Sequence, residues 1–348
     1  MTASEAEIWT QVDSESDNIR VAFEHLFSAE RYEEATAMVV DLSWFATLSM
    51  RMEMFGWARR LLEVPALVDV AELWAVRSIG QYLGASPECS HSARRSLELD
   101  SFDPTGLARA TLASIGLNNT FDAELSGDAT AKMLKYPSER FVEQQVIGLG
   151  LRSFHLCLRE AAPEAVEMAI EAMAKAEETG SPSAMAIGYW AQGVANLILD
   201  WPKAEESIRR GLAMTESMSS NHLVSHLLNG LVVHFASLTG PVHEAAETTA
   251  SEIRATMEKH YLLGASHLLG GASVVLCRAG RIDDGAALLG SMIDNGHRPR
   301  REIRKTLEAA LGDRTSAALD AGRGWSINEA GERAVQWLDE ISSHVADT

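Results

Sequence analysis

The chain has 348 residues, of which 46% are hydrophobic and 6% aromatic, and its formal net charge is −19. A chain of this length exceeds most single globular cores, so we expect two domains or one extended repeat array. The excess of acidic residues argues against binding nucleic acid or an anionic membrane surface. Ala, Leu, Glu and Met are abundant and alternating β-type runs are hard to find, so the composition predicts helix.

The first half of the chain predicts a series of helices separated by short turns. Most of the nine prolines stand at the start of an amphipathic run, where the missing N–H would be unpaired anyway. The predicted helices cover 15–29, 31–50, 52–63, 69–84, 88–99, 104–118, 122–136 and 138–160.

Localisation is predicted from what the chain lacks. The opening residues have neither the basic nor the apolar part of a signal peptide, and no apolar run reaches the ~18 residues of a membrane span. Cys89, Cys157 and Cys277 show no CxxC spacing, so we expect buried small hydrophobic residues in a reducing compartment. The chain is therefore predicted to be soluble and cytoplasmic.

The second half repeats with a period near 40 residues. Pro163, Pro202, Pro241 and Arg281 open successive charged, alanine-rich helices, and a more apolar helix follows each of the first three. One helical hairpin cannot bury both of its faces, so a period of this size predicts stacked hairpins. Each apolar helix has a glycine near its middle, which we expect to allow close helix packing. These glycines are Gly193, Gly230 and Gly271.

Two segments resemble a known family. Residues 17–63, DNIRVAFEHLFSAERYEEATAMVVDLSWFATLSMRMEMFGWARRLLE, resemble the opening of the tetratricopeptide-like C-terminal arm of actinobacterial signal-transducing ATPase and LuxR-type transcriptional regulators. Residues 322–338, GRGWSINEAGERAVQWL, are similar to the short motif that ends many such arms. The resemblance implies an arm that binds an inducer or partner protein. The chain has no GxxxxGK[ST] phosphate loop and no evident helix-turn-helix, so it is either one arm of a larger regulator or a stand-alone relative.

The repeat and the resemblance together predict an all-α fold. We expect a tetratricopeptide-like right-handed superhelix of antiparallel helical hairpins, an α-solenoid, over residues 1–296. A sub-boundary near residue 160 is left open, and residues 297–348 are expected to form a small helical C-terminal cap. Ser326 and Glu329 have the spacing of a capping box that opens the last helix.

Signatures of catalysis and metal binding are weak. His222 and His226 have metal-compatible spacing on a helix, but HExxH is absent and no third ligand is obvious. There is no GxSxG nucleophile motif, and the glycine-rich stretch 264–273 lies where the repeat demands a helix. We therefore predict no enzyme activity, no metal and no cofactor.

The three glycine-bearing helices, aligned on their glycines, present two stripes. One stripe is nearly all apolar and is expected to face the core. The other has hydrogen-bonding side chains without net charge, which suit recognition of a peptide or small polar ligand in a concave groove; it is alternatively an ordinary polar surface. The predicted binding residues are Tyr189, Gln192, Asn196, His222, Ser225, His226, Asn229, Ser266, His267 and Ser273.

A basic cluster follows the repeats, formed by Arg298, Arg300, Arg301, Arg304 and Lys305. It predicts either a solvated helix face or a docking point for an acidic partner or a neighbouring domain. The predicted function is a non-catalytic module that binds a protein, a peptide or a small inducer in bacterial transcriptional regulation or signalling. Two alternatives are a scaffolding or homo-oligomerisation protein, and an enzyme with an unrecognised active site in the same groove.

Overall fold

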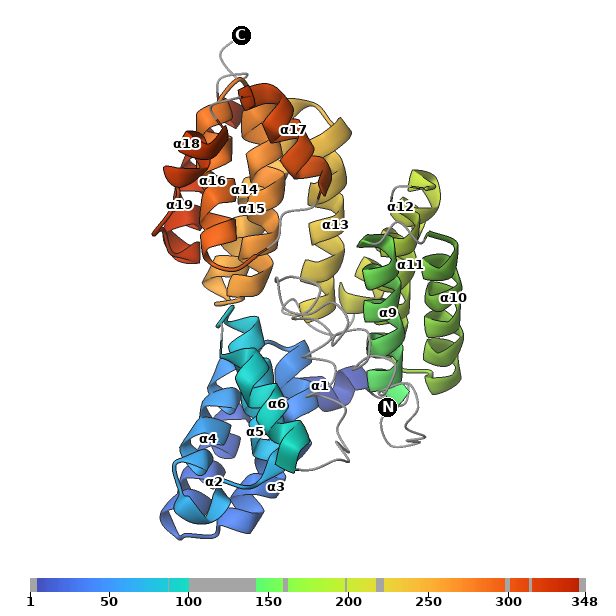
Figure 1. Cartoon of the computed structure of the whole chain (residues 1–348). Coiled ribbons are helices and arrows are strands. Elements are labelled where there is room, and N and C mark those ends of the chain that lie inside the picture. Colours follow the sequence, from blue (N-terminus) through green and yellow to red (C-terminus); the bar gives the residue numbers. More distant parts are fainter. Residues whose placement is uncertain are drawn as a thin grey trace. The chain divides into compact units, whose positions relative to one another are not determined.

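A computed structural model describes residues 5–86, 88–99, 142–158, 162–197, 199–216, 222–297, 301–312 and 315–343. Within these ranges every regular element is a helix and there is no strand, which confirms the predicted all-α class (Figure 1). None of the described helices is long and apolar enough to cross a membrane. The predicted helices at 104–118 and 122–136 lie outside the described residues.

The described chain forms two compact units. Unit 1 takes in most of the described residues up to Ser225, and unit 2 runs from His226 onward. The change between the two units falls within one helix, α13 (Leu223–Thr239). The repeat over 1–296, the sub-boundary near 160 and the cap over 297–348 stay predictions.

Unit 1 begins with a helix that the sequence analysis missed. Helix α1 covers Glu5–Ser14, ahead of the first predicted helix at 15–29. Its sequence is short and acidic, and it buries only two side chains, so its apolar periodicity is too weak to stand out. The other helices that the structure describes in unit 1 are α2 (Ser16–Ser28), α3 (Tyr32–Leu48), α4 (Met52–Leu62), a 3₁₀ turn (Pro65–Leu67), α5 (Ala71–Leu83), α6 (Cys89–Leu99), α9 (Val142–Leu158), α10 (Ala162–Thr179), α11 (Pro182–Asn196) and α12 (Trp201–Glu216).

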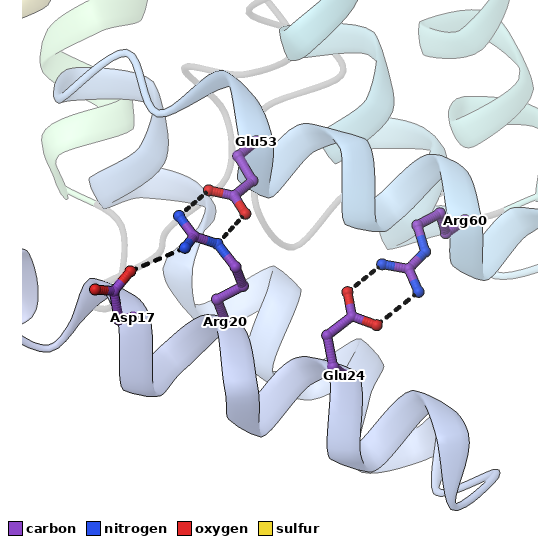
Figure 2. Close-up of polar contacts among 5 residues, drawn as sticks. All are labelled: Asp17, Arg20, Glu24, Glu53 and Arg60. Atoms are coloured by element: carbon purple, nitrogen blue, oxygen red, sulfur yellow. Dashed lines mark hydrogen bonds and ion pairs between the residues drawn. The ribbon is translucent and has the colours of Figure 1, made fainter.

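Two exposed ion pairs connect helix α2 to helix α4 (Figure 2). The Arg20 guanidinium donates to both carboxylate oxygens of Glu53, at 2.5 and 2.9 Å, and Arg60 does the same to Glu24. Arg60 also lies over the Phe27 ring, 4.7 Å from its centroid. These pairs align the two helices, although ion pairs at a surface contribute little free energy.

Unit 2 contains the rest of α13, α14 (Val242–Glu258), α15 (Leu262–Arg278), α16 (Ile282–Asp294), α17 (Arg301–Leu311), α18 (Thr315–Asp320) and α19 (Ile327–Ser343). Its core is made of fully buried aliphatic side chains of α14, α15, α16 and α19, such as Ile253, Leu269, Leu288 and Leu338. Helix α19 therefore shares one core with the hairpin helices, and each burial contributes about 1.5–3 kcal/mol to folding. The predicted capping box is confirmed: the Ser326 amide donates to Glu329 Oε2 at 2.8 Å, and the Glu329 amide to Ser326 Oγ at 3.2 Å.

The same three-residue turn joins four pairs of successive helices, two in each unit. In each turn the middle residue has positive φ, and the next amide donates to the helix carbonyl five residues before it, as in a Schellman motif. Only one of the four middle residues is glycine, so composition alone does not mark these turns. The middle residues are Glu30, Met50, His260 and Gly280.

The predicted role of the mid-helix glycines holds at one position and fails at another. A Cβ added to Gly271 would lie 3.1 Å from Val233 Cγ1, so α13 and α15 approach closely there. A Cβ on Gly230 would meet none of the described residues within 4 Å, so their packing does not require that glycine. The stretch 264–273 lies within α15, as predicted.

Candidate functional site

The predicted binding residues of unit 1 on α11 mostly serve the contact with α12. Tyr189 hydrogen-bonds Arg210, and this contact, with the nearby Glu206 carboxylate, raises the pKa of the Arg210 guanidinium. Gln192 Oε1 accepts from Ser207 Oγ at 3.4 Å, and Asn196 Nδ2 donates to the Gln192 carbonyl at 2.9 Å. All three predicted side chains are half-buried, so they combine a structural contact with partial access to solvent.

His222 is fully buried in unit 1 and lies just before α13 begins. Its Nδ1 accepts from the Val224 amide at 3.2 Å, so the ring proton is on Nε2, which faces Ser183 Oγ at 3.1 Å. The ring also stacks on Trp9, with centroids 5.1 Å apart. His222 is therefore a packed, hydrogen-bonded core residue, and the i, i+4 pairing with His226 does not arise because the two rings have separate partners.

His226 is the centre of a different cluster, built by α13 and α14 in unit 2. Its Nδ1 lies 2.6 Å from Glu252 Oε1, and its Nε2 lies 3.1 Å from Lys259 Nζ. Asn229, one turn further along α13, donates to Glu252 Oε2 at 3.1 Å. Carboxylate, imidazole and ammonium thus form one chain, and we call these four residues the α13–α14 cluster.

Burial and charge act together in the α13–α14 cluster. The His226 side chain is 4% exposed and that of Glu252 13%, whereas Lys259 and Asn229 are half-buried and reach the surface. Burial lowers the pKa of the Lys259 ammonium, and the carboxylates of Glu252 and Glu258 oppose this shift. A donor-rich edge, with an ammonium and an amide held in place from behind, can bind acceptor oxygens of a ligand.

The predicted serines of unit 2 on α15 have hydrogen-bond partners inside the protein. Ser273 Oγ donates to the Gly285 carbonyl of α16, and Ser266 Oγ donates to the Leu263 carbonyl at 2.7 Å. Ser266 Oγ also lies 3.3 Å from His297 Nδ1. Both serines are fully buried, so a ligand cannot reach them in this conformation. His267 is exposed, and in unit 1 Ser225 Oγ donates to the His222 carbonyl at 2.6 Å.

His297, which lies beside Ser266, is a buried histidine of unit 2. Its Nε2 has no hydrogen-bond partner among the residues that the structure describes. Burial lowers the pKa of the imidazole to about 4, because the charged form loses its hydration. His297 and His267 lie edge to face with ring centroids 6.3 Å apart. In the described part of the chain no three His, Cys, Asp or Glu side chains come together as a metal site would require.

The structure describes only part of the predicted basic cluster. Arg298 and Arg300 lie outside the described residues, and so do the side chains of Arg301 and Arg304, although their backbone is in α17. Lys305 is exposed. The predicted docking role stays a prediction.

Sequence reasoning brought together His226 and Asn229 but missed Glu252 and Lys259. Both missed residues lie on or just after the charged helix of the same repeat, which the stripe comparison left out. Their spacing of seven residues, about two helical turns, puts them on the same face of α14, and this was the available signal. Comparison with known proteins adds no identity, since no family model, no curated protein and no solved structure matches the chain.

Proposed function

We propose that the chain is a non-catalytic helical-repeat binding or sensing module for a protein, a peptide or a small inducer, with the α13–α14 cluster as its contact site. The observation that carries the proposal is the chain from Glu252 through His226 to Lys259, with Asn229 beside it. The resemblance to arms of bacterial regulators supports a role in transcriptional regulation or signalling, and an α-solenoid arrangement of the hairpins belongs to the same proposal.

The α13–α14 cluster favours binding because two of its residues are buried and the other two are partly accessible to solvent. His226 and Glu252 are buried and bonded to one another, so they fix the positions of the groups beside them. Lys259 and Asn229 are half-buried, so part of each is open to a partner. In a chain with a net charge of −19, a fixed ammonium is a distinctive local feature for a ligand that carries a carboxylate or carbonyl.

The test is a pull-down from native lysate with mass spectrometry of retained proteins and small molecules. Wild type is compared with Asn229→Ala/Lys259→Ala, which removes the accessible groups and leaves the buried pair. The matched control is Lys203→Ala, because Lys203 is an exposed, ion-paired lysine of unit 1. We expect a ligand retained by wild type and control and lost from the double variant. Equal retention by all three proteins would contradict the proposed site.

One observation favours a second candidate, an enzyme. A base held by a carboxylate and bonded to an amine has the arrangement of an activated nucleophile, with His226 oriented by Glu252 toward Lys259. The captured ligand discriminates the two functions. Saturable binding without turnover supports the module, whereas turnover that is lost in His226→Gln and retained in Lys203→Ala supports the enzyme.

A further inference from the structure

Lys259 lies in the hydrogen-bonded turn that ends α14. The next residue, His260, has a φ of 55°, and its amide donates to the Met257 carbonyl at 2.9 Å. The Tyr261 amide donates to the Thr256 carbonyl, also at 2.9 Å, which closes the turn as a Schellman motif. The backbone at Lys259 is therefore fixed, and its side chain extends from a defined point toward His226 of α13.

The hydrogen bonds of His226 determine which ring nitrogen carries the proton. An ionised carboxylate can only accept, and Glu252 Oε1 lies 2.6 Å from Nδ1, so Nδ1 donates to it. Nε2 then has a lone pair, because a second N–H at that position would face the Lys259 ammonium, a donor against a donor. The ammonium accordingly donates to Nε2 across 3.1 Å. His226 is thus oriented as a base toward this amine, and Glu252 stabilises the imidazolium that forms when the ring takes a proton.

The surroundings of the Lys259 amine favour its neutral, nucleophilic form. Burial lowers the pKa of the ammonium, although the carboxylates of Glu252 and Glu258 oppose this shift. Tyr261 is 2% exposed and its ring centroid lies 6.3 Å from that of His226, so an aromatic side chain keeps water from this side of the imidazole. A lysine amine that is partly desolvated beside a base has the arrangement of lysines that form Schiff bases.

We propose that Lys259 binds an aldehyde or ketone ligand covalently, as an imine, with His226 as the base that prepares the amine. This inference rests on the proposed function, because it uses the same α13–α14 cluster and names the class of ligand that the cluster takes. The bond is reversible by hydrolysis, which suits a binding module that must release its ligand.

Imine formation balances with the groups of the cluster. His226 Nε2 takes a proton from the Lys259 ammonium, and the neutral amine attacks the carbonyl carbon, so that a C–N bond forms and the π electrons of the carbonyl move to its oxygen. One amine proton passes to that oxygen and gives a carbinolamine. The imidazolium then returns its proton to the hydroxyl, which leaves as water while the nitrogen lone pair forms the C=N bond. Ammonium and carbonyl compound thus give protonated imine and water, without an oxidant or a reductant.

The first experiment traps the imine in the full wild-type chain with propanal and sodium borohydride near neutral pH, and peptide mass spectrometry measures the modification of each lysine. Lys203 is the internal control, because its exposed amine lies 2.9 Å from Asp200, which raises its pKa. We expect trapping at Lys259 to be about tenfold faster or more than at Lys203 in the folded chain, and equal to it in urea-unfolded chain. Equal trapping in the folded chain would overturn the proposal.

A variant tests the role of the base. His226→Gln keeps a hydrogen-bonding side chain but cannot take the proton, so trapping at Lys259 should fall to the rate at Lys203. His243→Gln is the matched control, since His243 is a partly exposed histidine on α14, and it should trap as wild type does. Trapping in His226→Gln at the wild-type rate would overturn the assignment of His226.

The variant Lys259→Arg separates this inference from the proposed function. Arginine keeps the positive charge and the donors, but its guanidinium stays protonated and forms no imine here. A ligand from lysate that borohydride fixes to wild type, and that Lys259→Arg loses, supports the covalent bond. A ligand that Lys259→Arg retains and Asn229→Ala/Lys259→Ala loses would overturn the covalent bond and leave the proposed contact site standing.

Discussion

Each unit has a glutamate whose carboxylate is largely withdrawn from water, Glu5 in unit 1 and Glu252 in unit 2. The two carboxylates differ in how many of their oxygens accept a hydrogen bond. Glu252 in unit 2 has a partner for each oxygen, His226 on one and Asn229 on the other. Among the described residues, Glu5 in unit 1 has two donors on Oε2 and none on Oε1. Depth does not explain the difference, because Glu5 is the more deeply buried of the two.

The two carboxylates therefore differ in the free energy that each is expected to contribute to folding. A fully bonded buried carboxylate stabilises the elements that supply its donors. A partly bonded one keeps a desolvation penalty that nearly offsets the free energy of its bonds. Glu252 is accordingly expected to stabilise unit 2 as well as to support Lys259, and the Glu5 carboxylate is expected to contribute little to stability.

The largest expected effect is a loss of stability at low pH, and it comes from the buried imidazole of His297 in unit 2. His297 has its folded-state pKa lowered to about 4 from an ordinary value of 6.5, so between these values the unfolded chain binds the proton more readily. Stability is fully present above about pH 6.5 and falls by about 3 kcal/mol as the pH drops to 4. Urea unfolding at several pH values measures this. His297→Gln should flatten the slope relative to wild type and His243→Gln, a more exposed control, should not; equal slopes in all three would contradict the assignment.

The next effect concerns thiols, which need no strong hydrogen-bond partner and so should behave alike in the two units. Burial raises the pKa of Cys89 in unit 1 and of Cys277 in unit 2 from 9.0 to about 11. At pH 8 the thiolate fraction of each is therefore about 100-fold lower than for an ordinary thiol. Iodoacetamide labelling, read by mass spectrometry, should be slower than in urea-unfolded chain by at least that factor. Rapid labelling of either thiol in the folded chain would contradict the raised pKa of that thiol.

The third effect is the loss of stability when each of the two glutamates, Glu252 and Glu5, is replaced by alanine. Glu252→Ala removes a charged hydrogen-bond acceptor from His226 and Asn229, and we expect it to lower the unfolding free energy by about 2 kcal/mol. Glu5→Ala should change it by no more than about 0.5 kcal/mol, because loss of two bonds is offset by release of an unpaired buried oxygen. The control is the exposed Glu247→Ala. Equal losses for Glu5→Ala and Glu252→Ala would remove the distinction drawn between them.

The smallest effect is expected for the exposed pair Glu24–Arg60, which is bonded as fully as Glu252 but in water (Figure 2). A double-mutant cycle with Glu24→Ala and Arg60→Ala should give a coupling of about 0.5 kcal/mol that weakens in 1 M salt. A coupling above about 2 kcal/mol would contradict this prediction, because it would mean that a fully hydrogen-bonded ion pair is strong even when solvent reaches it.

Several features of the fold could be predicted from the sequence. Helices 52–63 and 88–99 match α4 and α6 to within a residue, because apolar spacing and short polar breaks are local signals. The Ser326–Glu329 capping box was predicted because all of its atoms lie within one helical turn. Helix α1 and the left-handed residues Glu30, Met50 and His260 were not, since neither apolar period nor glycine marks them.

The candidate sites divide in the same way. The sequence by itself determined that His226 and Asn229 share a helix face, since their spacing is three residues along one helix. Only the tertiary structure decided that Glu252 and Lys259 meet them, that His222 lies in the core of unit 1, and that Glu5 reaches Ser181. Ser181 is 176 residues away from Glu5. Pairing between helices depends on how each is rotated and packed against the next, and a local pattern of residues carries no record of that.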